Sequence, residues 1–125
     1  MYPGKFDIKQ YQGATMDFPI WYRASGVLVD LAGYSAKMQL RSRIDSATVV
    51  LELSTQNGRI LLGDDVTSEA TSSGDLANIQ LLVSATTMKD IIVGQYVYDI
   101  DLTDPVAYNI PILYGSFILT GEVTR

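Results

Sequence analysis

Cysteine and histidine are both absent from this chain of 125 residues. Without cysteine, the chain forms no disulfides and has no thiolate nucleophile and no zinc site built on thiolates. Without histidine, it lacks the commonest general base and the commonest metal ligand. Together these absences exclude most classes of enzyme. We therefore predict that the protein is not an enzyme, with no catalytic residues, no metal site and no cofactor.

Long apolar segments are missing as well. A helix that crosses a bilayer needs about 20 predominantly apolar residues, and the apolar runs of this chain are far shorter. Residues 1–6 contain no charged segment followed by an apolar run, so they do not predict a signal peptide. We expect a protein that is made in the cytoplasm and has no membrane partner.

Basic residues are scarce and unevenly placed. Nine Lys and Arg stand against 14 Asp and Glu, which gives a formal net charge of −5 at pH 7. Residues 1–62 have a balance of +2, whereas residues 63–125 have a balance of −7. The acidic total argues against a nucleic acid as partner. The asymmetry allows oppositely charged parts of two copies to pair, and simple solvation of both kinds of charge is the alternative.

The chain is rich in apolar–polar alternation with a period of two, which is typical of half-buried β-strands. The side chains expected to face inward are Tyr34, Ala36, Met38 and Leu40; Ala77, Ile79, Leu81 and Val83; and Tyr96, Tyr98, Ile100 and Leu102. About eight strands, separated by turn signals and with at most one short helical turn, predict an all-β antiparallel β-sandwich. We expect a single domain, 1–125, and a small closed barrel is the alternative fold.

Three local signals refine this prediction. Pro19 cannot donate to a strand ladder, so the strand around it should lie at a sheet edge. Asn57-Gly58 is the strongest short signal for a hairpin, so residues 59–62 should pair back with the strand before them. Ser84 is placed to cap one helical turn that ends near Lys89.

The last strand, residues 110–120, is apolar on both faces. Its apolar side chains are Ile110, Ile112, Tyr114 and Ile118 on one face, and Leu113, Phe117 and Leu119 on the other. Such a strand is either central between two layers or covered by a partner, unless a bulge at Gly115 exchanges its faces. We hypothesise that these apolar residues contact a partner protein.

Opposite charges form stripes on the polar faces of two strands. The basic stripe is Lys37, Arg41 and Arg43, and the acidic stripe is Asp99 and Asp101. The stripes either stay solvated or meet, across a sheet or between subunits. Paired carboxylates also occur in Ca²⁺ sites and in acid–base catalysis, but alternation on a solvated strand face explains them without a site. Trp21 shares a face with charged residues, so we expect it to face outward unless something covers it.

Three segments resemble small virion proteins of tailed phages. Residues 26–42, GVLVDLAGYSAKMQLRS, are similar to the family segment GxPIDLTGYTARMQIRS. Residues 94–105, GQYVYDIDLTDP, are similar to GxYxYDLELTDP, and residues 121–125 resemble the family's characteristic end. The wider pattern, over roughly residues 5–125, is similar to the N-terminal domain of phage baseplate upper proteins.

This resemblance implies an immunoglobulin-like β-sandwich that serves as a non-enzymatic structural component of a virion, in the tail, baseplate or neck. The implied partners are other phage virion proteins, and we expect copies of the chain to associate in a symmetric assembly. The alternatives are a capsid decoration protein and a receptor- or glycan-binding module that uses exposed Tyr residues and Trp21. The expected location is the virion, after synthesis in the host cytoplasm.

Overall fold

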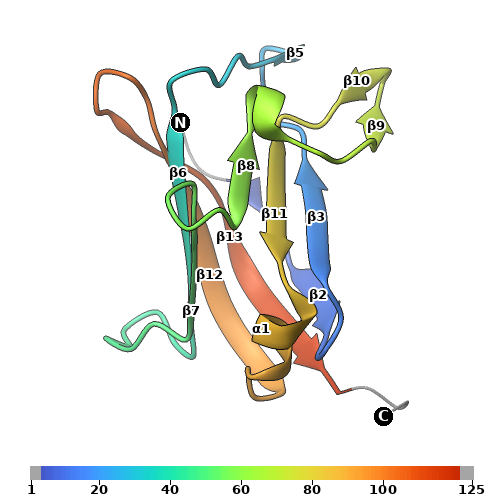
Figure 1. Cartoon of the computed structure of the whole chain (residues 1–125). Coiled ribbons are helices and arrows are strands. Elements are labelled where there is room, and N and C mark those ends of the chain that lie inside the picture. Colours follow the sequence, from blue (N-terminus) through green and yellow to red (C-terminus); the bar gives the residue numbers. More distant parts are fainter. Residues whose placement is uncertain (1–3, 122–125) are drawn as a thin grey trace.

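A computed structural model of the chain describes residues 4–121. Apart from Gly121, the closing motif at 121–125 falls outside the described residues. The described chain folds into two facing β-sheets, with two small hairpins beyond one end (Figure 1).

The larger sheet contains six strands. They are β1 (Gly4–Lys5) and β2 (Ile8–Tyr11), which both pair with β13 (Asn109–Thr120), followed by β12 (Gly94–Thr103), β6 (Ser35–Arg41) and β7 (Leu51–Ser54). The pairs between β13, β12, β6 and β7 are antiparallel. β1 and β2, however, run parallel to β13, which departs from the purely antiparallel sandwich that the alternation predicted.

The smaller sheet contains three strands, all antiparallel to their neighbours. In sheet order they are β3 (Met16–Ile20), β11 (Ile79–Val83) and β8 (Ile60–Leu62). β3 lies at the edge, as Pro19 predicted. The two hairpins are β4–β5 (Arg23–Ala24 and Val27–Leu28) and β9–β10 (Thr71–Ser72 and Asp75–Leu76).

Helical structure within residues 4–121 is limited to two short turns, α1 (Ala85–Lys89) and the 3-10 turn η1 (Gly63–Asp65). α1 is the helical turn that was predicted. The hydroxyl of Ser84 accepts a hydrogen bond from the backbone N–H of Thr87 at 3.3 Å, which satisfies one of the free donors at a helix start. η1 was not predicted, so the expected limit of one helical turn is wrong.

The order of the strands is that of an immunoglobulin-like sandwich. One sheet has the order β8-β11-β3 and the other β7-β6-β12-β13, which corresponds to strands D-E-B and C′-C-F-G of that fold. Where the chain passes from β11 to β12, the Tyr96 hydroxyl donates a hydrogen bond to the backbone carbonyl of Ile92. This contact is the tyrosine corner of immunoglobulin-like domains. The prediction of an all-β, immunoglobulin-like sandwich is confirmed.

One hydrophobic core lies between the two sheets. The predicted inward residues of β11 and β12, together with Ala36, Met38 and Leu40 of β6, are all buried, and Tyr34 packs half-buried against them. Burying one large apolar side chain contributes roughly 1.5–3 kcal/mol. The strands therefore adopt the register that places the apolar residues of each alternating pattern in the core.

The pairing predicted at Asn57-Gly58 is wrong. The turn itself forms, because Asn57 Oδ1 accepts hydrogen bonds from the backbone N–H groups of Ser54 at 3.0 Å and Arg59 at 3.1 Å. The strands on either side nevertheless separate, since β7 pairs with β6 and β8 pairs with β11. Each strand buries its apolar residues, which are Leu51 and Leu53 on β7 and Ile60 and Leu62 on β8. The two strands therefore bury these residues in the same core from opposite sheets.

Candidate interaction surface

A bulge in β13 decides which of its side chains reach the surface. The pairing with β12 shifts register between Ile100 and Asp101, which lie opposite Leu113 and Pro111. Ile112 is therefore the extra residue on β13. A bulge of this kind reverses the alternation of inward and outward side chains beyond it. The predicted exchange of faces thus takes place at Ile112 and not at Gly115.

The five apolar interface candidates of β13 all pack against the core of their own chain. Ile112, Phe117 and Leu119 are 8%, 0% and 1% exposed, respectively. Ile110 and Leu113 are half-buried and also pack against the core. Most of their apolar surface is thus covered within the molecule, which leaves little of it for a partner, and the hypothesis that they contact one stays a prediction.

Gly115 allows the N-terminal segment to cross β13 at close range. A Cβ at this position would lie 2.1 Å from the backbone oxygen of Phe6, so no other residue fits without movement of the backbone. Asp7 Oδ1 accepts a hydrogen bond from the backbone N–H of Ser116 at 3.0 Å, and the Phe6 N–H donates to the backbone oxygen of Tyr114 at 2.9 Å. These contacts hold β1, and with it Lys5, beside β13.

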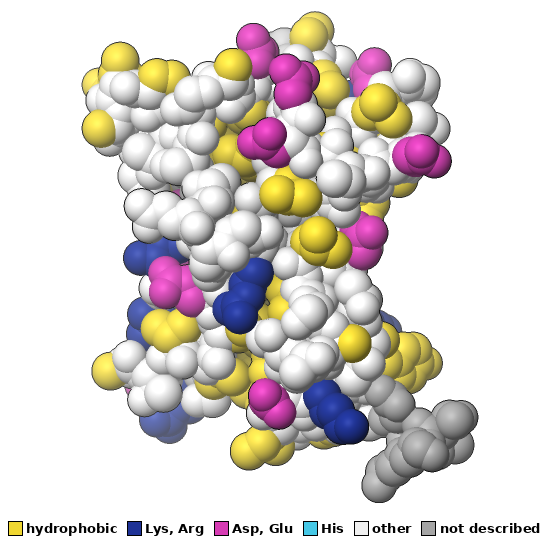
Figure 2. Space-filling view, viewed as in Figure 1, with side chains coloured by type: hydrophobic (Ala, Val, Ile, Leu, Met, Phe, Trp, Pro, Cys, Tyr) yellow, Lys and Arg dark blue, Asp and Glu magenta, His cyan; other side chains and the backbone are white. Residues whose placement is uncertain are grey.

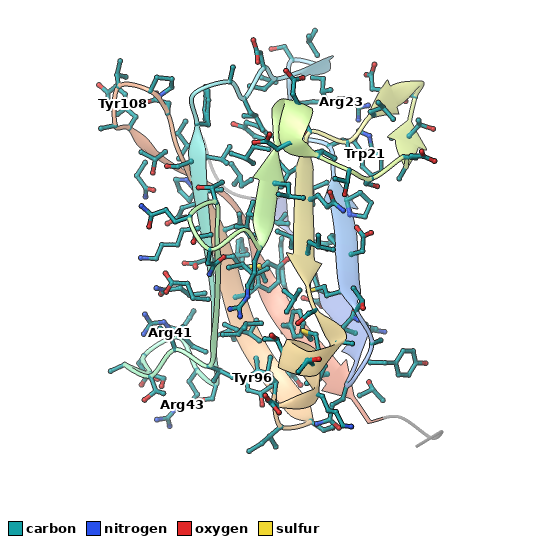
Figure 3. All side chains as sticks on the ribbon, in the orientation of Figure 1. Trp21, Arg23, Arg41, Arg43, Tyr96 and Tyr108 are labelled. Atoms are coloured by element: carbon teal, nitrogen blue, oxygen red, sulfur yellow. The ribbon has the colours of Figure 1, made fainter. Side chains whose placement is uncertain are left out.

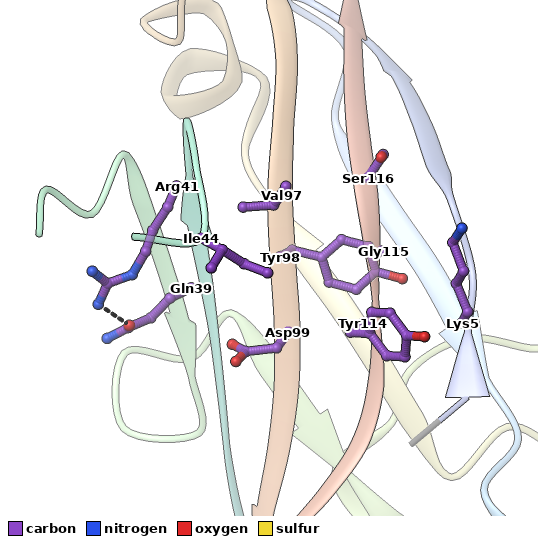
Figure 4. A pocket seen from close by; sticks show the side chains of 10 residues that line it. All are labelled: Lys5, Gln39, Arg41, Ile44, Val97, Tyr98, Asp99, Tyr114, Gly115 and Ser116. Atoms are coloured by element: carbon purple, nitrogen blue, oxygen red, sulfur yellow. Dashed lines mark hydrogen bonds between the residues drawn. The ribbon is translucent and has the colours of Figure 1, made fainter. Parts of the chain in front are cut away.

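A groove of about 590 Å³ lies on the face of the larger sheet that points away from the core. We call it the outer-sheet groove (Figure 4). Its apolar lining comes from Val97 on β12, Tyr114 on β13 and Ile44 in the loop after β6. Its charged lining includes Arg41, Asp99 and Lys5 from β6, β12 and β1. The groove therefore combines an apolar surface with charges of both signs.

Electrostatics in the groove centre on Asp99. Its partial burial and the neighbouring charge of Asp101 raise the pKa of the Asp99 carboxyl, and the charge of Arg41 opposes this shift. Arg41 is itself held in place, because its guanidinium donates to Gln39 Oε1 at 2.7 Å and to the backbone oxygen of Ser46. The groove thus contains Asp99, whose negative charge is only partly offset, and Arg41, whose side chain is held in place by hydrogen bonds.

The two charge stripes lie side by side across the sheet, as one of the sequence alternatives predicted. Asp101 is directly opposite Lys37 on β6, and Lys37 Nζ also lies 3.5 Å from Glu52 Oε1 on β7. Arg43 is not part of the stripe, because β6 ends at Arg41. It lies in the following loop, with its Nε 3.5 Å from Asp45 Oδ1. The expectation that Arg43 shares a strand face with Lys37 and Arg41 is therefore wrong. A contact between the stripes of two subunits stays a prediction.

Trp21 is covered by its own chain. The indole N–H donates to the backbone oxygen of Asp75 at 2.9 Å, and the ring is half-buried. Arg23 supports the same hairpin, because its guanidinium donates to the Ser72 oxygen at 2.8 Å and approaches Asp75 Oδ2 at 3.4 Å. Figure 3 shows both side chains beside the β9–β10 hairpin. These contacts indicate that Trp21 helps to hold the β9–β10 hairpin against the sandwich.

Acidic side chains gather at one end of the sandwich. Figure 2 shows them over the end that carries η1 and the β9–β10 hairpin, whereas the basic side chains visible on this face lie in the other half. The acidic residues of η1 and the β9–β10 hairpin are Asp64, Asp65 and Asp75.

Val97 is a surface residue that the sequence candidates missed, and Tyr114 was expected only as one apolar residue of the terminal strand. Val97 was detectable, because it is an apolar residue at an outward position of the alternation that ends in Asp99 and Asp101. Tyr114 was harder to place, because its direction depends on the bulge at Ile112. A bulge of one residue leaves little signal in a strand that is apolar throughout.

Within residues 4–121, no group of three or more acidic side chains is arranged to hold a metal ion. No helix in the same range has the length and apolar character needed to cross a membrane.

Comparison with known proteins gives few relatives. No protein-family model and no curated protein matches the chain. Among solved structures, the chain is similar to the extracellular domain of the voltage-gated sodium channel beta4 subunit, whose parallel homodimers are described as explaining its role in cell–cell adhesion. The two share 9% identity with a TM-score of 0.37, over 98% of this chain and 97% of the other. A likeness at this level defines neither a shared function nor a shared partner.

Proposed function

We propose that this protein is a non-enzymatic structural component of a tailed-phage virion, in the tail, baseplate or neck. It acts through contacts with other virion proteins and with copies of itself. The observation that carries the proposal is the resemblance of residues 26–42 and 94–105 to small virion proteins of tailed phages. These segments contain β6 and β12, which pair directly over seven residue pairs. The resemblance therefore falls on one continuous piece of the larger sheet.

The surface of that piece suits a module that packs against proteins. Its outward side chains line the outer-sheet groove, which is large, partly apolar and open to a protein partner. The proposal needs no cofactor and no membrane, and the net charge of −5 argues against nucleic acid as a partner. Localisation in the virion, after synthesis in the host cytoplasm, follows from the same resemblance.

Immunogold electron microscopy of purified particles tests the proposal and its position within the particle. Antibodies raised against the recombinant chain should label the tail, baseplate or neck at a fixed distance from the capsid. Label spread evenly over the capsid would instead identify a decoration protein. If particles remain unlabelled and denatured particle protein is also unreactive on a blot, these results together would contradict a virion role.

Binding to a receptor or glycan is the alternative with the weaker structural support. It relied on exposed Tyr residues and on Trp21, and the Trp21 indole is half-buried and bonded to Asp75. Exposed aromatic side chains do exist elsewhere, at Tyr11 and Tyr108. A glycan array probed with the intact chain separates the two functions, because a structural module should bind no glycan above background.

A further inference from the structure

The turn between β12 and β13 ends in three apolar residues that are exposed to solvent. We call Val106, Ala107 and Tyr108 the hairpin tip. Val106 and Tyr108 are 74% and 71% exposed, and Ala107 is exposed as well. Figure 3 shows Tyr108 at the outer end of this hairpin, clear of both sheets.

Hydrogen bonds from a single aspartate hold the hairpin tip in one shape. Asp104 Oδ1 accepts from the backbone N–H groups of Val106 at 3.0 Å and Tyr108 at 2.9 Å. The backbone oxygen of Asp104 accepts from the N–H of Ala107 at 3.0 Å. Pro105 occupies the second position of this turn, where its fixed φ is favourable. A tip held in this way loses little conformational freedom when a partner binds it.

The tip is also under backbone strain. Ala107 has a φ of +70°, at the position of a three-residue hairpin that normally carries glycine. The left-handed conformation costs a residue with a Cβ about 1–2 kcal/mol. Strained residues of this kind cluster at functional sites. Rigidity, strain and exposed apolar surface together indicate a binding element.

We propose that the hairpin tip of one copy inserts into the outer-sheet groove of a neighbouring copy of this chain. This inference rests on the proposed role in a symmetric assembly, and it names the two surfaces that meet. Because the tip and the groove are different surfaces, the contact is heterologous. Repetition of a heterologous contact generates a closed ring or a filament.

The two surfaces are complementary in chemistry. Val106 and Tyr108 supply apolar side chains, and Val97, Tyr114 and Ile44 supply an apolar lining for them. Asp104 lies at the base of the tip and residues 104–109 contain no Lys or Arg, whereas the groove presents Lys5 and Arg41 against a single Asp99. The groove volume of about 590 Å³ lies within the roughly 300–1,000 Å³ of sites that enclose small ligands.

The tip cannot occupy the groove of its own chain. Five residues of extended chain separate Asp99 in the groove from Asp104 at the base of the tip, a distance of about 16 Å at 3.3 Å per residue. β12 lies between β6 and β13 and cannot fold back. A hairpin tip that fills the groove therefore comes from another copy. A contact of this small size is weak alone, and closure of a ring strengthens it.

Sedimentation velocity over a series of concentrations tests this contact in the full chain. The tip variant carries Val106→Ser and Tyr108→Ser, which leave the backbone hydrogen bonds to Asp104 in place. The groove variant carries Val97→Ser and Tyr114→Ser. A matched control carries Val27→Ser and Leu76→Ser, two exposed apolar residues of the other hairpins. Ile44→Ser, which changes only a loop residue, provides a second groove variant if the doubly substituted sheet fails to fold.

The expected pattern distinguishes this contact from other modes of association. Wild type and control should sediment faster as concentration rises, and the tip and groove variants should each associate at least tenfold more weakly. An equimolar mixture of the tip and groove variants should form only one-to-one dimers, because each such pair retains one intact tip and one intact groove.

Three results would overturn the proposal. They are a wild type that stays monomeric at every concentration, a tip variant that associates like wild type, and a mixture that forms no dimers. The second result would mean that copies associate through a surface other than the tip. None of the three changes the outcome of the particle-labelling test, so failure of this contact is distinguishable from failure of the proposed function.

Discussion

The Tyr98 hydroxyl donates a hydrogen bond to the backbone oxygen of Phe6, which lies 92 residues earlier in the chain. The ring of Tyr98 points into the sandwich opposite Gly115, where β13 has no side chain. The hydroxyl can therefore reach the N-terminal segment from inside. This bond attaches the segment between β1 and β2 to the larger sheet.

Replacing Tyr98 by Phe should lower the free energy of unfolding by about 1–2 kcal/mol, because the Phe6 carbonyl loses its donor. Burial, and secondarily the charge of Asp7, raise the pKa of Tyr98 well above its ordinary value. The folded state therefore holds this proton more tightly than the unfolded state, and stability is lost as pH rises above the ordinary pKa of tyrosine. Urea unfolding from pH 7 to pH 11 should show less of this loss in Tyr98→Phe.

Tyr108→Phe is the matched control for that experiment, since its ring is exposed at the hairpin tip. It should change stability by less than about 0.5 kcal/mol. Equal effects of the two substitutions would mean that the bond to Phe6 contributes nothing.

Gly115→Ala should destabilise the fold by about 1–3 kcal/mol or more, because the new Cβ would clash with the Phe6 backbone. Hydrogen exchange should show that the loss of protection begins at β1 and β2. Gly94→Ala is the control, because a Cβ there meets no atom within 4 Å. If both variants unfold at the same denaturant concentration, the close crossing at Gly115 is not a constraint.

Neighbouring residues of β13 should differ sharply in their effect on stability. Phe117→Ala should cost about 3–5 kcal/mol, because the ring is fully buried between the sheets. Ile118→Ala should cost at most about 1 kcal/mol, because Ile118 lies on the outer face opposite Gln95. Guanidinium unfolding of both variants measures the difference. Similar costs would contradict the bulge at Ile112, which sets the faces of this strand.

Asp99→Asn should raise the melting temperature at pH 7. The folded pKa of Asp99 is raised above its ordinary value of 3.8. The ionised carboxyl is therefore held less favourably in the folded state, and stability falls as pH rises through this range. The advantage of the variant should disappear near pH 3, where the carboxyl is protonated in both states. Asp65→Asn, at the opposite end, controls for the change in net charge. A lower melting temperature for Asp99→Asn at pH 7 would mean that pairing with Arg41 outweighs burial.

Ala107→Gly should stabilise the isolated chain by about 1 kcal/mol, because glycine adopts the left-handed conformation of this position without strain. The same substitution loosens the hairpin tip, so association between copies should weaken. Differential scanning calorimetry and sedimentation velocity on the same sample measure the two effects. A variant that is less stable than wild type would contradict the strain at Ala107.

The sequence predicted those parts of the fold that depend on local alternation. Tyr96, Tyr98, Ile100 and Leu102 were correctly placed in the core, because neighbouring residues of a strand must point to opposite faces. The turn at Asn57-Gly58 was also located correctly. Its partner strand was not, because the sheet that β8 joins depends on how the whole core is filled and not on the turn.

The interaction surface was harder to predict for the same reason. The apolar residues of β13 were expected on both faces. The one-residue bulge at Ile112 instead turned the five named candidates inward and left Tyr114 and Ile118 on the outer face. A meeting of the two charge stripes across a sheet was one of the alternatives, and Lys37 does lie opposite Asp101, because alternation fixed their faces. The covering of Trp21 by the β9–β10 hairpin depends on contacts between residues 54 positions apart, which no local pattern contains.

The most direct measurement of the central claim is a quantitative mass-spectrometric census of particles purified by density gradient. Peptides of this chain should be present at a constant ratio to the major capsid protein across the particle peak, at several copies per particle. Peptides found only in the soluble fraction of the lysate, with none in the particle peak, would contradict a structural role in the virion.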